Sequence, residues 1–220
     1  MEHYKELFLT ELWKLNDYLY SYFLTSTLGK IELVASILTI LCVWLCNRQS
    51  IWNFPVGIIA VLLFGFIFYQ VQLYADATLQ FGYFLPVSFF GWWYWWTQGP
   101  GRDDLPIRPA SAWEWGLTVN LTLIGTLGAG YYFATYTQAA FPYPDSFILA
   151  ASIIAQFLLS KKVIENWVLW VAVDLVAIPV YYLKGLYVTS GLYFILLCIA
   201  THGLISWVVS YRTYDRWGRA

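Results

Sequence analysis

The fold is decided by residues 51–98, IWNFPVGIIAVLLFGFIFYQVQLYADATLQFGYFLPVSFFGWWYWWTQ. This stretch is almost wholly apolar and closes with four tryptophans, yet it carries amides at Asn53, Gln70, Gln72 and Gln80. A related segment, IENWVLWVAVDLVAIPVYYLKGLYVTSGLYFILLCIATHGLISW, occupies residues 164–207. Polar side chains at membrane depth are costly and usually face a cavity or a partner. Two related segments of this kind therefore predict a substrate pathway.

The composition is that of a membrane protein. Hydrophobic residues make up 60% of the 220 residues and charged residues 11%, whereas a soluble domain has roughly 25% charged residues. The aromatic content of 21% fits an aromatic belt at the membrane interface. Apolar runs of about 20 residues predict spanning helices, because barrel strands are about half as long. We expect an all-α integral membrane protein, and the net charge of −1 gives no indication of a nucleic-acid partner.

Seven transmembrane helices are predicted from the apolar runs and the turn signals between them. They cover residues 31–46, 52–73, 77–96, 113–135, 146–160, 166–183 and 186–206. Helical periodicity over residues 3–26 predicts an amphipathic helix that lies on the membrane surface or packs against the bundle. The Pro- and Gly-rich loop after Gln98 separates two halves. The predicted parts are an N-terminal helix (1–30), a three-helix unit (31–97), a loop with a linker helix (98–143), a second three-helix unit (144–210) and a cytoplasmic tail (211–220).

An internal repeat relates the two three-helix units at a constant offset of 113 residues. The aligned pairs include Arg48 with Lys161, Asn53 with Asn166, and Tyr69 with Tyr182. Because each unit has three spans, the fourth span lets both units run in the same direction. We expect a parallel three-plus-one-plus-three repeat, a plan that places a transporter's substrate site at the interface between the repeats.

Lysine and arginine residues in the loops predict the orientation in the membrane. The side of the N-terminus carries Lys5, Lys14, Lys30 and Lys184. The opposite side carries Arg48, Arg102, Arg108, Lys161, Lys162, Arg212, Arg216 and Arg219. The more basic side is expected to be cytoplasmic, which places the N-terminus outside and the C-terminus inside.

Candidate pathway residues share helix faces. Asn166, Trp170 and Asp174 recur every four residues, and Asp174 is the only acid well inside a predicted span. The alternative for this stripe is a network of hydrogen bonds between helices. A second stripe starts at Gln80 and continues to Trp92, whose alternative role is in an interfacial aromatic belt. These stripes predict a cavity with amides, aromatic faces and one carboxylate.

The ligand class follows from what these spans hold. No Lys or Arg lies clearly inside a predicted span, so a phosphate or carboxylate would lack a partner. Aromatic faces stack on flat rings or hold cations, and amides hydrogen-bond hydroxyls. The pattern favours a neutral or cationic molecule with hydroxyls and a flat ring.

Catalytic and metal-binding roles are not indicated. The chain has no HExxH or GxSxG motif, and for His202 a structural hydrogen bond is favoured over catalysis. Cys42 and Cys46 are interpreted as small buried hydrophobic residues rather than metal ligands. We expect no enzyme activity, no catalytic residue, no metal and no cofactor.

Several segments resemble the PnuC family of bacterial nicotinamide riboside transporters. They are LFG-x-I-x-x-Q-x-QLYA at 63–75, GWWYW at 91–95, YPDS at 143–146, ENW-x-LWV at 165–171 and KGLYVTSGLY at 184–193. The resemblance covers residues 31–207 and implies a seven-helix fold related to the sugar-carrying SWEET proteins. It also implies uptake of nicotinamide riboside, an NAD precursor, across the bacterial inner membrane by facilitated diffusion. A cytoplasmic kinase would then trap the riboside by phosphorylation.

The resemblance also implies the residues that line or contact the substrate. They are Asn53, Gln70, Gln80, Asn166, Trp167, Trp170 and Asp174, to which Trp92 is added as the continuation of the Gln80 stripe. Amides are assigned to the ribose and carboxamide, tryptophans to the ring, and Asp174 to positive charge or hydroxyls. The family pattern allows Asn at this last position, so proton coupling through it is not implied.

Two alternatives stay open at this point. One is a carrier for another vitamin or nucleoside, such as thiamine. The other is a membrane enzyme that uses His202 and Asp174. The expected surroundings are membrane lipid, and a homo-oligomer is left open by the sequence.

Overall fold

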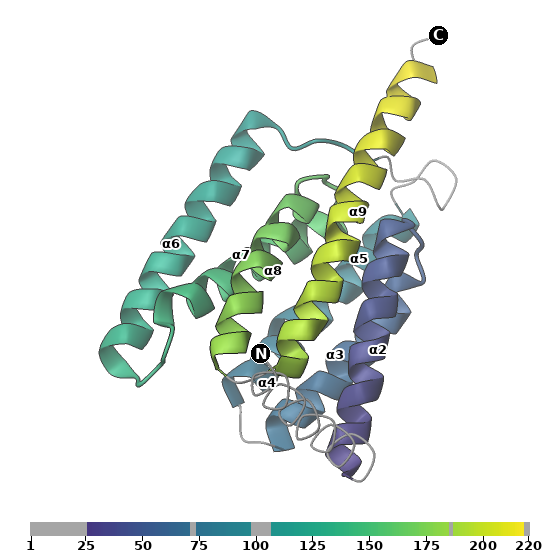
Figure 1. Ribbon diagram of the computed structural model, residues 1–220. Coiled ribbons are helices and arrows are strands. Elements are labelled where there is room, and N and C mark those ends of the chain that lie inside the picture. The colour runs from purple at the N-terminus through teal and green to yellow at the C-terminus, as the bar shows by residue number, and fades with distance from the viewer. Residues whose placement is uncertain (1–25, 71–73, 98–106, 185–186, 218–220) are drawn as a thin grey trace, which may run out of the picture.

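The computed structural model describes residues 26–70, 74–97, 107–184 and 187–217, which form an almost entirely helical protein (Figure 1). The elements are α2 (Thr27–Asn47), α3 (Asn53–Gln70), α4 (Tyr74–Leu79), the π-helical segment η2 (Gln80–Phe84), α5 (Leu85–Thr97), α6 (Ala112–Tyr136), α7 (Pro142–Ser160), α8 (Asn166–Leu183) and α9 (Tyr187–Trp217). Within these residues the only β pairing is a single bridge. The all-α prediction is therefore confirmed, while the predicted amphipathic helix at 3–26 falls on residues outside the described part apart from its last residue.

The predicted spans agree with the helices to different degrees. α8 has the predicted bounds, 166–183, whereas α9 continues as a helix to Trp217, beyond the predicted span end at 206. The third predicted span is not one continuous α-helix, because η2 separates α4 from α5. Five described helices are long and apolar enough to cross a membrane, namely α2, α3, α7, α8 and most of α9. The count of seven spans stays a prediction.

The helices form two groups. We call α2, α3, α4, η2 and α5 the first bundle, and α7, α8 and α9 the second bundle. The last helix of each bundle packs against the first helix of the other, α9 against α2 and α5 against α7. Among the described elements, α6 packs only against α7, at the edge of the molecule (Figure 1). The centre of the protein is therefore the interface between the two bundles.

The turns inside the two bundles are built alike. Gln49 after α2 and Lys162 after α7 both have positive φ angles, 54° and 51°. The side chain of Asn53 donates from Nδ2 to the Ser50 carbonyl at 2.7 Å, and Asn166 Nδ2 donates to the Val163 carbonyl at 2.6 Å. An amide at the start of a helix satisfies a carbonyl of the preceding turn, which explains asparagine at both positions.

The turn between α7 and α8 has an additional support. Residues 107–111, here called the connecting segment, cross this turn before α6 begins. The Arg108 amide donates to the Lys162 carbonyl at 3.2 Å, and the Ile164 amide donates to the Arg108 carbonyl at 3.0 Å. Glu165 Oε2 accepts from the Ala110 amide at 2.7 Å. Hydrogen bonding to the Glu114 carboxylate, 2.7 Å away, raises the pKa of Arg108 and fixes the segment to the first turn of α6. The second bundle is therefore tied to the linker helix at this end.

Candidate functional site

A cavity of about 260 Å³ lies between the two bundles. The first bundle lines it with Thr39, Cys42, Val43, Cys46, Asn53, Phe54, Gly57, Ala60, Val61, Phe64, Gln80, Phe84 and Ser88. The second bundle lines it with Ser152, Gln156, Leu159, Trp167, Trp170, Asp174, Tyr193, Leu196 and Ala200. We call these two sets the first wall and the second wall. The cavity thus combines apolar and aromatic surface with a few polar groups, as small-molecule sites do.

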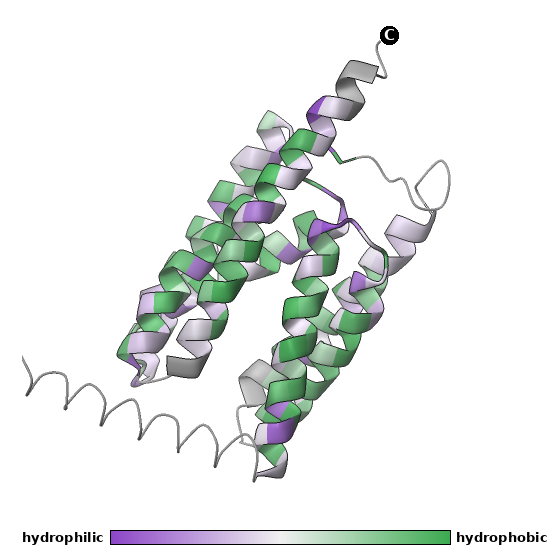
Figure 2. Ribbon diagram, turned by 45° about the vertical axis from the view of Figure 1, so that its right-hand side comes forward, coloured by the Kyte–Doolittle hydropathy of each residue, from purple (hydrophilic) through white to green (hydrophobic). Residues whose placement is uncertain are grey.

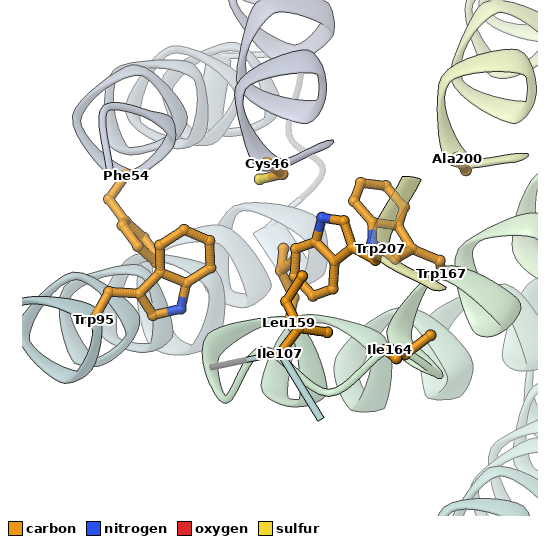
Figure 3. Close-up of a cluster of buried hydrophobic side chains, with 9 residues drawn as sticks. All are labelled: Cys46, Phe54, Trp95, Ile107, Leu159, Ile164, Trp167, Ala200 and Trp207. Atoms are coloured by element: carbon orange, nitrogen blue, oxygen red, sulfur yellow. The ribbon is translucent and has the colours of Figure 1, made fainter. Parts of the chain in front are cut away.

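A cluster of buried side chains from both bundles and the connecting segment, which we call the closing cluster (Figure 3), shares five residues with the cavity lining and bounds the cavity on that side. It contains Cys46, Phe54, Trp95, Ile107, Leu159, Ile164, Trp167, Ala200 and Trp207. Figure 2 shows the two groups of helices separating toward the opposite end of the molecule. The turns at Gln49 and Lys162 and the connecting segment all belong to the closed end.

Two aromatic pairs form the centre of the closing cluster. Phe54 meets Trp95 edge to face, with ring centroids 5.0 Å apart and planes at 88°. Trp167 meets Trp207 in the same way, at 5.5 Å and 87°. A glycine packs against one ring of each pair. A Cβ on Gly91 would lie 2.5 Å from the Phe54 ring, and a Cβ on Gly203 would lie 2.9 Å from the Trp167 ring, so neither position has room for a side chain. Each bundle therefore contributes one edge-to-face pair.

Hydrogen bonds join the bundles at the closed end. Trp95 Nε1 donates to the Ser160 carbonyl at 3.0 Å, and Trp207 Nε1 donates to the Asn47 carbonyl at 3.1 Å. Each bond runs from the last helix of one bundle to the end of the first helix of the other. The side chain of Asn47 also contacts His202 Nδ1 at 2.6 Å. Opening this end requires these bonds to break, because they cross the interface.

Five of the eight predicted substrate residues line the cavity: Asn53, Gln80, Trp167, Trp170 and Asp174. The other three lie elsewhere. Gln70 is exposed at the last residue of α3. Trp92 is half-buried beside a separate groove that it shares with Phe89, Trp93 and Trp96. Asn166 is fully buried and caps the turn before α8.

The separation of Trp92 from its predicted stripe has a structural reason. Gln80, Phe84 and Ser88 of the stripe line the cavity. Ser88 is the last residue of the stripe in the lining, and Trp92 follows it by one regular turn of α5. Trp92 packs against the closing cluster instead, at the end of the cavity.

Some lining residues were not recognised from the sequence. Gln156 and Ser152 of α7 carry polar atoms to the second wall, and Tyr193 of α9 joins them. Neither Ser152 nor Gln156 belongs to a motif with a chemical signature. The repeat offset contains a signal for Ser152, because it stands 113 residues after Thr39, which lines the first wall.

Asp174 is the one carboxylate in the cavity lining. It is 2% exposed and lies on α8, four residues after Trp170. Among the described residues no lysine, arginine or histidine forms an ion pair with it. Tyr193 also lines the cavity, and its ring stacks on that of Tyr181 with centroids 5.1 Å apart. A buried carboxylate without a cation partner can serve a positively charged or hydroxylated ligand.

Two further groups bear on the chemistry of the cavity. Trp167 Nε1 is buried and has no hydrogen-bond acceptor within the described residues, although the ring lines the cavity. His202 lies outside the lining and is engaged with Asn47. The pairing of His202 with Asp174 that an enzyme would need is therefore not formed in this arrangement.

Comparison with known proteins places these features in a family. Residues 29–209 match the family described as nicotinamide mononucleotide transporter. The nicotinamide riboside transporter PnuC of Escherichia coli is 33% identical over 88% of this chain and 90% of its own length. The riboflavin/roseoflavin transporter RibM of Streptomyces davaonensis is 26% identical over 84% of this chain and 87% of its own. The crystal structure of the vitamin B3 transporter PnuC superposes with a TM-score of 0.69 at 22% identity, covering 96% of this chain and 93% of that chain.

Proposed function

Because this chain belongs to the PnuC family of multi-pass inner-membrane transporters, we propose that it carries nicotinamide riboside into the cell. The charge of the cavity is the observation that carries this proposal. Its described lining holds one carboxylate, Asp174, and no lysine or arginine. Nicotinamide riboside is a cation with a flat ring and a hydroxylated sugar, which matches a carboxylate, tryptophan faces and amides.

The same observation separates the riboside from the mononucleotide. The 5′-phosphate of the mononucleotide is anionic and needs cationic or N–H-rich partners. Asp174 would instead repel it in a cavity of low dielectric. The proposed substrate is therefore the unphosphorylated riboside, the form that the name of the Escherichia coli relative also gives.

The volume of the cavity also helps to distinguish the riboside from riboflavin. A volume of about 260 Å³ is below the 300–1,000 Å³ that holds drug-sized ligands. This favours a nucleoside with one aromatic ring over riboflavin, whose three fused rings are larger. Thiamine, which is also a cation, is the closer competitor and is separated from the riboside by competition binding.

The transport route follows from the interface between the bundles. In this proposal the two bundles are parallel repeats related by an axis along the membrane normal, as in SWEET proteins, and the substrate sits between them. The closing cluster is the cytoplasmic gate, and the N-terminus lies outside. The tryptophan hydrogen bonds across the interface break when the gate opens.

The energetics proposed are those of facilitated diffusion. The described lining has no second titratable carboxylate or histidine that would form a proton relay with Asp174. Accumulation then depends on phosphorylation of the riboside by a cytoplasmic kinase, because the phosphorylated product no longer fits the cavity.

Reconstituted vesicles test the proposal. Purified protein in vesicles without any ion gradient should equilibrate labelled nicotinamide riboside across the membrane and leave the mononucleotide outside. Uptake that requires a proton or sodium gradient would contradict facilitated diffusion. Equal transport of the mononucleotide would contradict the charge argument.

A further inference from the structure

Two cysteines face the cavity from α2. Cys42 and Cys46 are one helical turn apart, and both line the first wall. Residues at i and i+4 of a helix have Cβ atoms about 5–6 Å apart, so their sulfurs share a face. Cys46 is buried and Cys42 is half-buried. The remaining cysteine, Cys198, is exposed on α9 and is not part of the lining.

The Cys42 thiol contacts two residues of α3. Cys42 Sγ donates to the Asn53 carbonyl oxygen at 3.3 Å. A Cβ on Gly57 would lie 2.9 Å from the same sulfur, so glycine leaves the space that the thiol occupies. These contacts hold the sulfur in a defined place at the edge of the cavity.

The second bundle does without sulfur at the equivalent positions. The residues 113 places after Cys42 and Cys46 are Ala155 and Leu159, which are both buried. Packing of the first helix of a bundle against its neighbours therefore does not require thiols. The paired thiols are a chemical feature of the first wall alone.

We propose that Cys42 and Cys46 form a binding site for a soft monovalent metal ion, Ag⁺ or Cu⁺, and that the bound ion blocks transport. Thiolates are the ligands that soft ions prefer, and these two ions accept two sulfurs in a linear arrangement. Zinc needs four ligands, and the described residues contain no group of three or more His, Cys, Asp or Glu side chains placed to hold a metal ion.

The binding reaction is an exchange of protons for metal. Each thiol releases its proton to solvent, two sulfur–metal bonds form, and no atom changes its oxidation state. The Cys42 thiol also gives up its hydrogen bond to the Asn53 carbonyl.

The position of the site explains the block. Cys46 is a member of the closing cluster, and Cys42 packs against that cluster. An ion that bridges both sulfurs adds bulk and charge at the closed end of the cavity and fixes the α2 side of the gate. The blocking half of the proposal rests on the proposed transport function, whereas the binding half does not.

Titration of the purified full-length protein with silver nitrate in chloride-free buffer tests the binding half. Wild-type protein and Cys198→Ala should each bind one Ag⁺ at the cavity with release of two protons. The double variant Cys42→Ala/Cys46→Ala should lose this binding, and each single variant should weaken it by about tenfold or more. A double variant that binds Ag⁺ as tightly as Cys198→Ala would overturn the site.

A second measurement avoids substitutions in the cavity. Cys198→Ala protein is treated with N-ethylmaleimide, which adds across its double bond to a thiol, and the alkylated peptides are identified by mass spectrometry. Prior Ag⁺ should protect Cys42 and Cys46 together, and protection of neither would overturn the site.

Riboside uptake in vesicles tests the blocking half. Ag⁺ should abolish uptake by Cys198→Ala. The rate of uptake by Cys42→Ala/Cys46→Ala should be the same with Ag⁺ as without it. Persistent uptake by Cys198→Ala with Ag⁺ bound would overturn the block. Absence of riboside uptake before any Ag⁺ is added would instead count against the proposed function, and the binding titration would still stand.

Discussion

The two walls of the cavity stand on similar helices but carry different chemistry. At positions 113 residues apart, Phe54 corresponds to Trp167, Gly57 to Trp170, and Val61 to Asp174, and all six line the cavity. The second wall thus holds both tryptophans and the carboxylate, while the first wall holds three phenylalanines, two amides and both thiols. A substrate with a charged ring at one end and a sugar at the other needs two unlike surfaces. The two bundles therefore have similar turns at the closed end of the cavity, while the side chains at equivalent positions of the two walls offer different contacts to a ligand.

The largest expected effect comes from replacing Asp174 of the second wall by valine, the residue at the equivalent position 61 of the first wall. Asp174→Val should weaken riboside binding by about 100-fold, because losing a buried partner of a charge costs about 2–5 kcal/mol. Titration of intrinsic tryptophan fluorescence measures the affinity. Asp174→Asn removes the charge but keeps hydrogen-bonding atoms, so it should also weaken binding, by less than Asp174→Val.

The matched control for this change lies on the first wall. Val61→Thr adds a hydroxyl at the position equivalent to Asp174 with little change of volume. It should leave affinity within about threefold, a difference of less than 1 kcal/mol. Equal losses from Asp174→Val and Val61→Thr would remove the distinction between the walls.

The next effect concerns the aromatic face of the second wall. Trp170→Ala should lower affinity by about tenfold to 100-fold, because stacking of a base on an aromatic ring contributes about 1–3 kcal/mol. Trp92→Ala, which removes a tryptophan outside the cavity lining, is the control and should bind the riboside like wild type. A stronger loss from Trp92→Ala than from Trp170→Ala would show that the sequence-predicted stripe, and not the cavity lining, identifies the site.

Features of the fold and the cavity that depend on residues close together in the sequence could be predicted, whereas features that depend on tertiary contacts could not. The α8 bounds follow from local apolar runs and turn residues, and they agree with the structure. Asn53, Gln80, Trp167, Trp170 and Asp174 were named from helix faces and family motifs, and they line one cavity. Gln156 carries no motif and reaches the cavity only through the packing of α7, which is a tertiary contact.

The closing cluster could not be predicted either. The bonds from Trp95 to Ser160 and from Trp207 to Asn47 join residues that are 65 and 160 positions apart. These contacts depend on how helices of different bundles pack against each other, α5 against α7 and α9 against α2, and local sequence patterns do not indicate such packing.

A smaller effect is expected where the bundles are alike. Trp95→Phe and Trp207→Phe each remove one hydrogen bond across the closed end while keeping an aromatic ring. A buried hydrogen bond contributes about 1 kcal/mol, so each variant should shift the balance between closed and open gates by about fivefold. The maximal rate of riboside uptake should change in the same direction in both variants, with affinity nearly unchanged. Opposite changes would show that the two bonds are not equivalent.

The smallest effect is expected at the connecting segment. Arg108→Gln removes a partly exposed ion pair with Glu114, and such pairs contribute about 0–1 kcal/mol. Thermal unfolding should shift by no more than about 2–4 °C, and riboside affinity should stay the same. A loss of affinity comparable to that of Asp174→Val would mean that the connecting segment shapes the cavity.

The central claim is that a cavity with Asp174 and no basic lining residue selects the cationic riboside. Parallel titrations of the purified protein with nicotinamide riboside and nicotinamide mononucleotide, followed by tryptophan fluorescence, test it most directly. The riboside should quench the fluorescence saturably, and the mononucleotide should bind more weakly by about 100-fold or more. Equal affinities for the two ligands would contradict it.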